Sequence, residues 1–378
     1  MNKTYLISDI CDVGSSKRIY LSEYQNMGVP FYRGKEIIEK EDNKEISNEL
    51  FISRERYNEI KIKYGVPEIG DILMTAVGTI GISWYVDESD FYFKDGNLIW
   101  FKNFKQDIIN SKYLYYIFKS KMFSEIIKNI SIGSTQKAIT IEQIKKIELS
   151  IPSINIQNKI VKILDDINKK IVLNNQMNDN LNEVQRCYFK ELFNSDLCNE
   201  MKLDDLFDIS AGGDAPKDKS DHKNDEYIYP IVSNGIDNDG IYGYSKEFKI
   251  NKKSVTISAR GTIGYKVLRN YCYYPIVRLI SLVPKSDSIS SEYLFYALDE
   301  VQILGSGTTQ QQLTVPMVKN IIIKVYDYEK IKKFTDFSSK TNMKIESNRI
   351  ENMKLSLLRD TLLPKLMNGE ICLDNIEI

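Results

Sequence analysis

The sequence contains very little histidine and cysteine. Its 378 residues include one histidine, His222, and five cysteines that are scattered along the chain and never form a Cys-x-x-Cys pair. A Ser-His-Asp or Cys-His mechanism, or a multi-histidine metal site, would have to be built around His222, which we interpret as a solvated loop residue. The cysteine pattern argues against a disulfide framework and a zinc ribbon, and it favours a reducing, cytoplasmic location.

Long apolar runs are also missing. No apolar stretch approaches the roughly 18–20 residues that span a bilayer, and the first residues lack the apolar core of a signal peptide. We therefore expect neither export nor membrane insertion.

The known catalytic motifs are absent as well. The sequence has no G-x-x-x-x-G-K-[ST] loop, no G-x-G-x-x-G, no H-E-x-x-H and no G-x-S-x-G. It has no Pro-Pro pair, so it lacks the N-P-P-[YF] or D-P-P-[YF] motif of amino-methyltransferases. We interpret the acidic pairs Asp165-Asp166 and Asp204-Asp205 as solvated or capping residues. We therefore expect no catalytic site, no metal and no cofactor on this chain.

The chain has almost no net charge. Its 51 Lys and Arg residues are balanced by 52 Asp and Glu residues, a formal net charge of −1. A protein that binds DNA alone usually has a basic excess, because neutralising phosphates supplies most of the non-specific affinity. If this chain binds nucleic acid, we expect it to share the phosphate contacts with a partner.

A repeat spans nearly the whole sequence. Four segments of the first half return in the same order in the second half: 7–13 as 203–209, 75–81 as 258–264, 111–116 as 291–296, and 133–136 as 307–310. The order indicates two copies of one structural unit. The first copy is longer, and we interpret the charged run 39–45 and the residues after it as a solvated surface insertion.

Each copy is followed by a long helical pattern. Apolar residues, including Met177 and Val184, recur every three or four positions after 156, which predicts a helix of about 40 residues. A second stripe, which includes Leu358, is expected to stop at Pro364 and Gly369. We predict that the two helices pair as an antiparallel coiled coil, with Asn174 and Asn348 near the middle of the stripes, where a polar residue can fix the register. Two ordinary surface helices are the alternative. The residues assigned to the coiled coil and to partner contacts are Ile160, Ile167, Leu181, Tyr188, Phe334, Ile345, Leu355 and Leu362.

Within each copy, short runs rich in Val, Ile, Tyr and Phe are broken by Gly, Asn and Asp, which indicates a β-rich α+β domain. Strands are predicted at 69–74, 81–86 and 254–258, and helices at 111–127 and 290–298. The predicted fold class is therefore α+β, with two tandem β-rich heads joined by two long antiparallel helices in a pseudo-two-fold internal repeat. The expected boundaries are 1–153 and 199–326 for the heads, 154–198 and 327–370 for the helices, and 371–378 for a tail.

Polar loops recur at matched places in the two copies. The two Gly-Thr-Ile-Gly segments allow tight turns whose backbone N–H groups can approach an anion. The neighbouring Ser, Thr, Asn, Gln, Lys and Arg residues are the types that hydrogen-bond phosphates and base edges. The copies differ within these loops, as expected of two domains that recognise two different DNA sequences. Taken alone, each loop is better interpreted as an ordinary turn. The predicted DNA-contact residues are Arg33, Lys35, Thr75, Gly78, Thr79, Ser134, Thr135, Gln136, Lys137, Ser233, Asn234, Ser258, Arg260, Gly261, Thr262, Thr308, Thr309, Gln310 and Gln311.

These features together resemble the DNA-specificity subunit of type I restriction-modification systems over essentially the whole chain. Two tandem domains contain G-T-I-G and G-[ST]-T-Q, and each is followed by a long helix. The segment 359–371 (RDTLLPKLMNGEI) looks like the end of the family's distal helix, and 185–193 (QRCYFKELF) looks like its counterpart in the central helix. The first copy departs from the usual pattern at residues 75–77, because Ser-Ala-Arg at 258–260 is closer to it.

The resemblance implies that each head is a target-recognition domain that reads one half of a bipartite double-stranded DNA target. It implies that the helices act as a ruler and dock two copies of an N6-adenine methyltransferase subunit, with a possible translocating nuclease subunit. S-adenosylmethionine would then bind to the methyltransferase, and this chain would not be catalytic.

Two other classes of protein remain alternatives. A two-headed scaffold that binds protein in place of DNA would explain the acidic balance and the many tyrosines, since aromatic residues also anchor protein interfaces. A nuclease would need a metal site assembled from scattered acidic residues.

Overall fold

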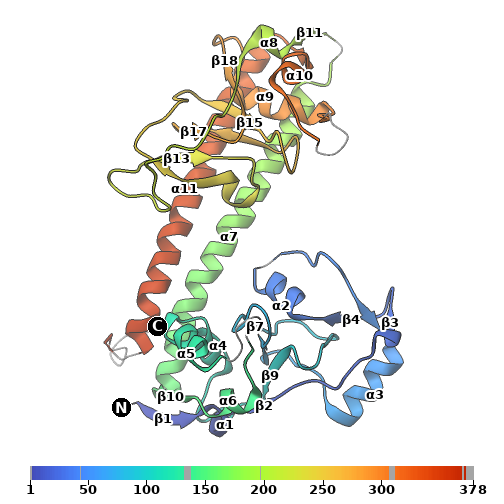
Figure 1. The fold of residues 1–378 in the computed structure, drawn as a ribbon, viewed down its shortest axis with the longest axis vertical. Helices are drawn as coiled ribbons and strands as arrows, with labels where there is room; N and C mark the ends of the chain where they lie inside the picture. Colours follow the sequence, from blue (N-terminus) through green and yellow to red (C-terminus); the bar gives the residue numbers. More distant parts are fainter. Residues whose placement is uncertain are drawn as a thin grey trace. The chain divides into compact units, whose positions relative to one another are not determined.

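The computed structural model describes residues 2–42, 44–131, 138–195, 197–305, 311–367 and 370–371 (Figure 1). The chain forms two compact units: unit 1 contains residues 1–173 and 351–378, and unit 2 contains residues 174–350. Each unit combines one β-rich head with parts of both long helices, and each is described by itself. No helix in these described ranges is long and apolar enough to cross a lipid bilayer.

The head of unit 1 is organised around a four-stranded antiparallel sheet in the order β2-β9-β6-β7. Its strands are β2 (Asp12–Gly14), β9 (Leu98–Lys102), β6 (Ile72–Thr75) and β7 (Ser83–Tyr85). Successive side chains of a strand point to opposite faces. Ile72 and Met74 therefore join the core that contains the head's helices, while Leu73 packs in a second cluster with Trp84 and Trp100. Burial on both faces explains why this strand reads as a continuous apolar run.

The other elements of unit 1 surround this sheet. A second sheet has the order β3-β5-β4-β8, with β4 and β8 parallel, and a two-stranded ribbon joins β1 to β10. Their bounds are β1 (Lys3–Leu6), β3 (Tyr24–Gln25), β4 (Val29–Tyr32), β5 (Phe51–Ile52), β8 (Tyr92–Phe93) and β10 (Glu148–Ile151). The helices are α1 (Ile7–Ile10), η1 (Leu21–Glu23), α2 (Gly34–Glu41), α3 (Arg54–Tyr64), α4 (Ser111–Phe118), α5 (Lys121–Ile130) and α6 (Ile141–Lys145).

The head of unit 2 repeats this plan. Its main sheet has the order β12-β18-β15-β16, its second sheet is β14-β13-β17 with β13 and β17 parallel, and β11 pairs with β19. The strands are β11 (Asn199–Lys202), β12 (Phe207–Ala211), β13 (Tyr229–Val232), β14 (Ile241–Ser245), β15 (Ser254–Ile257), β16 (Lys266–Arg269), β17 (Tyr274–Pro275), β18 (Ile280–Pro284) and β19 (Ile322–Val325). The helices are α8 (Leu203–Leu206), η2 (Asp237–Gly240), α9 (Ser291–Ala297), η3 (Leu298–Glu300) and α10 (Val315–Lys319). The matching strand order confirms the internal repeat.

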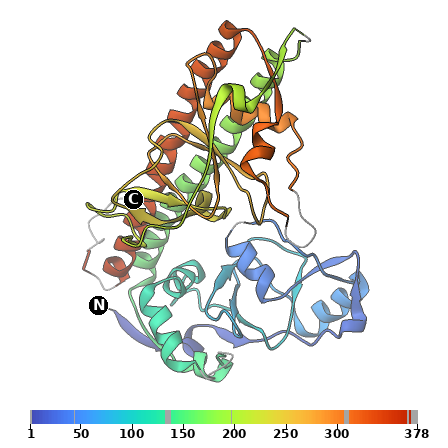
Figure 2. The ribbon, with the colours of Figure 1, turned by 45° about the horizontal axis from the view of Figure 1, so that its top comes forward.

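Two long helices complete both units: α7 (Ile154–Leu192) and α11 (Tyr328–Met367). Figures 1 and 2 show them side by side in each unit. In unit 1, Asn168 of α7 accepts a hydrogen bond from Arg359 of α11 at 3.1 Å. In unit 2, Phe189 packs against Phe334 with ring centroids 5.2 Å apart. Early residues of α7 thus meet late residues of α11, and the reverse, which confirms the predicted antiparallel pairing.

The helix interface of unit 2 is more polar than the apolar stripe predicted. Asn348 donates to Asn178 Oδ1 at 2.8 Å, and Gln185 donates to Asn342 Oδ1 at 3.2 Å and accepts from the Ser338 hydroxyl. Met177, Val184 and Leu358, which were assigned to the stripes, are exposed. At Met177 and Val184 of unit 2 hydropathy alone selected exposed positions, because buried amides and hydroxyls that bind one another replace apolar contacts. Asn174 and Asn348 are both buried, as their predicted role requires.

Two helix boundaries differ from the prediction. The segment 111–127, expected as one helix, forms α4 and α5, because Ser120 has an extended backbone (ψ 150°) and its hydroxyl accepts the Phe123 N–H at 3.2 Å as the N-cap of α5. Pro364 does not stop α11, which continues to Met367. Proline removes only the backbone bond to residue 360, and this loss is tolerated one turn from the helix end.

The charged run 39–45 is not simply a solvated insertion. Glu41 ends α2, and its carboxylate accepts hydrogen bonds from the Tyr115 hydroxyl at 3.0 Å and pairs with Lys119. Lys40 binds Glu88 at 2.7 Å. Burial raises the pKa of Glu41 above its usual range although these partners favour the carboxylate. The insertion therefore ties α2 to α4.

Candidate nucleic-acid interface

The same tight turn follows β6 in unit 1 and β15 in unit 2. We call residues 75–82 the first GTIG turn and residues 258–265 the second GTIG turn. Gly78 and Gly261 have φ angles of +80° and +69°, in the left-handed region that favours glycine. The turns are closed by hydrogen bonds from Gly81 N to Thr75 O at 2.9 Å and from Gly264 N to Ser258 O at 3.0 Å. Thr79 and Thr262 are exposed at the two tips.

Thr75 and Ser258 do not present their hydroxyl groups to solvent, which corrects their assignment to the DNA-contact set. Both residues are 1% exposed. Thr75 Oγ1 accepts the Ile82 N–H at 3.0 Å, and Ser258 Oγ donates to the Asn234 carbonyl at 3.2 Å. These small hydroxyls are therefore part of the turn's internal support.

The segment after α5, and its counterpart in unit 2, run beside the GTIG turns. Ile139 N donates to Ala76 O at 3.0 Å, and Leu313 N donates to Ala259 O at 2.9 Å. In each unit, a residue that lies far along the sequence from the GTIG turn, Ile139 or Leu313, is thus hydrogen-bonded to that turn. The predicted contacts Ser134, Thr135, Gln136 and Lys137, with Thr308, Thr309 and Gln310, lie outside the described residues.

Arg260 is the exposed cation of the second GTIG turn. Its Nη2 donates to Gln312 Oε1 at 3.2 Å, so the side chain bridges the turn and the segment that contains the exposed Gln311. Val77 occupies the matching position of the first turn and is half-buried. The two units therefore share a turn and differ in the side chain at its tip.

Arg33 and Lys35, the predicted DNA-contact cations of unit 1 that the structure describes, lie at the start of α2. Arg33 donates to the buried Glu36 through Nε at 3.1 Å and Nη2 at 2.6 Å, and its own backbone N–H donates to the same carboxylate at 2.8 Å. This pairing removes Arg33 from the set of free cations. Lys35 is exposed, with its ammonium nitrogen 3.7 Å from Glu39.

Asn234 acts as a brace in unit 2. Its Oδ1 accepts the Ala259 N–H at 2.7 Å, and its Nδ2 donates to the Val277 carbonyl at 2.7 Å. Ser233, next to it, is half-buried and its N–H donates to Gly240 O at 2.8 Å. The exposed part of this loop is 235–238, which the sequence analysis did not single out. The turn dipeptides Asn-Gly at 234–235 and Asp-Gly at 239–240 were the available signal.

The residues assigned to the helix pair fall into two groups. Ile160, Ile167, Phe334 and Ile345 are buried, and Leu181, Tyr188, Leu355 and Leu362 are half-buried. Tyr188 packs edge-on against Phe337, with ring centroids 4.7 Å apart. The helices also leave apolar side chains exposed: Val172, Leu173, Met353 and Leu357 in unit 1, and Met177, Val184, Met343 and Ile350 in unit 2.

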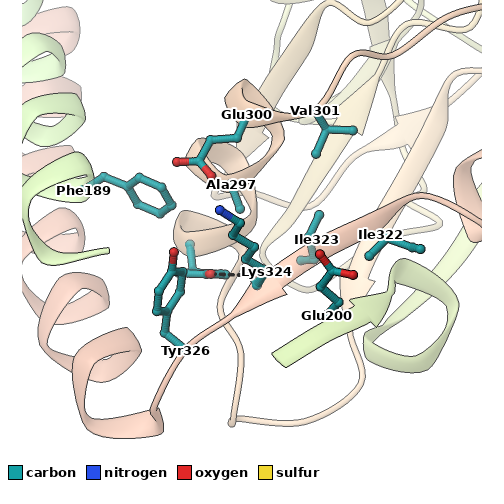
Figure 3. Close-up of a pocket in the computed structure, with 10 residues that line it drawn as sticks. Phe189, Glu200, Ala297, Glu300, Val301, Ile322, Ile323, Lys324 and Tyr326 are labelled. Atoms are coloured by element: carbon teal, nitrogen blue, oxygen red, sulfur yellow. Dashed lines mark hydrogen bonds between the residues drawn. The ribbon is translucent and has the colours of Figure 1, made fainter. Parts of the chain in front are cut away.

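A pocket of about 180 Å³ lies between Phe189 of α7, η3 and the β11-β19 ribbon of unit 2 (Figure 3). Glu200, Glu300 and Lys324 are exposed around it. Its phenols are already engaged, since Tyr293 donates to the Lys324 carbonyl at 2.6 Å and Tyr326 donates to the Phe193 carbonyl at 2.7 Å. In the part of the chain that the structure describes, no group of His, Cys, Asp or Glu residues fits a metal ion. The two phenols of this pocket therefore support the packing of unit 2.

Two titratable groups with pKa values raised by burial, Cys11 and Asp71, lie in the interior of unit 1. Cys11 is buried, and burial raises the pKa of its thiol to about 12, which disfavours the reactive thiolate. Burial also raises the pKa of Asp71, whose carboxylate accepts the Trp100 indole N–H at 2.7 Å. Asp165, expected to be solvated, accepts the Tyr116 hydroxyl at 2.6 Å and pairs with Lys112 at 2.8 Å. His222 is exposed, as expected.

Comparisons with known proteins agree on one family. The model described as "Type I restriction modification DNA specificity domain" matches residues 2–183 and 196–355. A putative type I specificity subunit of Mycoplasma pneumoniae is 34% identical over 223 residues, which cover 56% of this chain and 58% of that relative. The chain thus spans less than two thirds of that relative's length.

Two further matches cover nearly the whole chain. The type I restriction enzyme MjaIX specificity subunit of Methanocaldococcus jannaschii is 25% identical over 98% of this chain and 93% of its own length. The crystal structure of a type I restriction-modification system S subunit from M. genitalium has a TM-score of 0.62 at 16% identity, and covers 97% of this chain and 96% of that one. The second match supports the fold alone.

Proposed function

The chain belongs to the type I restriction-modification DNA specificity family, and on this premise we propose that it reads a bipartite, gapped sequence in double-stranded DNA. Each head, residues 1–153 and residues 199–326, reads one half-site as a target-recognition domain. The chain itself catalyses no reaction and holds no cofactor. An N6-adenine methyltransferase partner holds S-adenosylmethionine, and the complex works in the cytoplasm.

The observation that carries this proposal is the GTIG turn that recurs in both units. Each unit has a GTIG turn that is hydrogen-bonded to a second segment, at Ile139 or Leu313, and the side chains at the matching positions Val77 and Arg260 differ between the units. Two domains with the same backbone turn and different exposed side chains suit the recognition of two different DNA sequences. Contacts to base edges determine the sequence that is recognised, whereas contacts to phosphates only position the protein on the DNA. The readers we propose are Lys35, Gly78 and Thr79 in unit 1, and Arg260, Gly261, Thr262 and Gln311 in unit 2. The predicted contacts at 134–137 and 308–310 remain proposed readers on the basis of the sequence alone.

The helices are the proposed docking site for two methyltransferase subunits, with a nuclease subunit as a possible further partner of the complex. Exposed apolar side chains on both helices, among them Met343 and Met353, support this role. Apolar groups exposed on a helix pair favour burial against another protein. The net charge of −1 also fits a complex in which the methyltransferase subunits supply part of the contacts to the DNA phosphates.

The test is to purify the tagged chain from its native cells and to map N6-methyladenine in the genome with and without the intact gene. We expect a methyltransferase to co-purify and one gapped methylated sequence to disappear in the deletion strain. Co-purification of unrelated proteins with unchanged methylation would contradict the proposal and favour the protein-binding scaffold.

A further inference from the structure

The loop that joins β13 to β14 is hydrogen-bonded to the second GTIG turn near both of its ends. At one end, Asn234 Oδ1 accepts the Ala259 N–H at 2.7 Å. At the other end, Asp239 Oδ1 accepts the Tyr265 hydroxyl at 3.3 Å. The exposed residues 235–238 of the loop are therefore neighbours of the exposed tip 260–262. We call residues 233–240 the brace loop.

The backbone of the brace loop is unusual. Asn238, Asp239 and Gly240 are three consecutive left-handed residues, with φ angles of +50°, +52° and +75°. Ser233 N donates to Gly240 O at 2.8 Å and closes the loop. A Cβ atom on Gly240 would lie 2.4 Å from the Ser233 carbonyl oxygen, so only glycine fits. Such a run persists only when the surrounding structure holds it in place.

Arg269 provides that support from inside the head. It is 1% exposed, and its Nη2 donates to the Asp239 carbonyl at 2.6 Å. Two further N–H groups bind Thr256 Oγ1 at 3.1 Å through Nε and the Tyr271 hydroxyl at 2.9 Å through Nη1. None of these three acceptors is a carboxylate. A buried cation that binds only neutral groups is a costly way to fill a core. What this cation holds is the strained backbone of the brace loop.

The tip of the brace loop carries groups suited to a base edge. Asn238 is exposed, and its side-chain amide has no hydrogen bond to any residue that the structure describes. An asparagine amide pairs in two places with the N6 and N7 edge of adenine. The neighbouring carboxylate of Asp239 is turned to Tyr265 and lies 3.7 Å from Arg349, so its charge is partly compensated within the unit.

We propose that the brace loop is a further DNA-reading element of unit 2, in which Asn238 contacts an adenine edge and Arg269 is the positioning residue. This inference rests on the proposed function. It moves the reading role from Asn234, whose amide is engaged, to the exposed tip four residues later. It also gives unit 2 a reader for which no matching residue was assigned in unit 1.

The experiment uses the complete complex with its methyltransferase in cells and maps N6-methyladenine genome-wide. The variants are Asn238→Ala, Arg269→Lys and, as a matched control, Asn251→Ala, an exposed asparagine elsewhere in the same head. We expect Asn238→Ala to relax one adenine position of one half-site by roughly 5- to 150-fold. The other half-site and the Asn251→Ala variant should be unchanged.

Arg269→Lys tests the positioning role, because lysine keeps the charge and loses the planar fork of donors. We expect the same adenine position to become degenerate. A merely structural role would lower methylation at every position equally and leave the base preference intact, which would overturn this assignment. An Asn238→Ala variant that matches Asn251→Ala would overturn the reading role. A wild-type chain that directs no methylation at a gapped sequence would refute the proposed function, and the inference with it.

Discussion

Replacing Asn348 by leucine removes one half of the amide pair that joins α11 to α7 in unit 2. Asn178 and Asn348 are 8% and 1% exposed, and the bond between them is 2.8 Å long. In the single variant Asn348→Leu, the side-chain oxygen Oδ1 of Asn178 stays buried without its donor, which lowers the free energy of unfolding by about 1–3 kcal/mol. The double variant Asn178→Leu/Asn348→Leu removes both amides, including the unpaired Asn348 Oδ1, so we expect it to be neutral or stabilised.

A double-mutant cycle measured by thermal unfolding checks this reasoning. In a domain of this size each kcal/mol shifts the midpoint by about 2–4 °C. Asn180→Leu, an exposed change of the same type on α7, is the control and should change stability by less than about 0.5 kcal/mol. Single effects that simply add in the double variant, within about 0.5 kcal/mol, would refute a direct coupling between the two amides.

Three other changes test separate parts of the molecule. Arg260→Ala should abolish or relax recognition of one half-site only, by roughly 5- to 150-fold in methylation mapping, and equal loss at both half-sites would contradict base reading by Arg260. Deleting one helical turn inside Ile160–Ile171 shifts the helix by about 5.4 Å and should change the gap between half-sites or abolish methylation, so an unchanged gap would contradict the ruler. Glu41 has a pKa raised by burial, so its ionisation destabilises unit 1 as the pH rises through that raised value. Glu41→Gln should therefore gain stability relative to wild type in thermal unfolding as the pH rises from about 4 through the raised pKa of Glu41, and a difference that stays constant with pH would refute this.

The fold class and the family could be predicted from the sequence because both depend on patterns that a chain displays directly. The Gly-Thr-Ile-Gly segments recur at matched places, and the two main sheets have the same strand order. Repetition predicts topology without any knowledge of packing. The long helices could also be predicted, because apolar residues recur every three or four positions within them and this periodicity is local in the sequence.

The details of the site depend on contacts between distant residues, which no local pattern encodes. From the sequence, Arg33 was predicted to be a cation available for DNA. In the structure its guanidinium is hydrogen-bonded to the carboxylate of Glu36. Asn234 is a residue type that can hydrogen-bond a base edge. In the structure its side-chain oxygen instead accepts the Ala259 N–H and supports the turn. The helix face was misjudged at Val184 because buried Gln185 finds polar partners on α11. In each case the partner, and not the residue type, decides what the side chain does.

The division of the long helices between the units has a consequence for synthesis. Unit 2 is one continuous stretch, 174–350, whereas unit 1 needs residues 351–367 to supply Leu363 and Leu366 to its core. At typical rates of about 5–20 residues per second, the ribosome delivers those leucines roughly 10–40 s after it has finished residue 173. The head made first therefore belongs to the unit that is completed last, and a chain released just after residue 350 would carry a complete second unit and an incomplete first one.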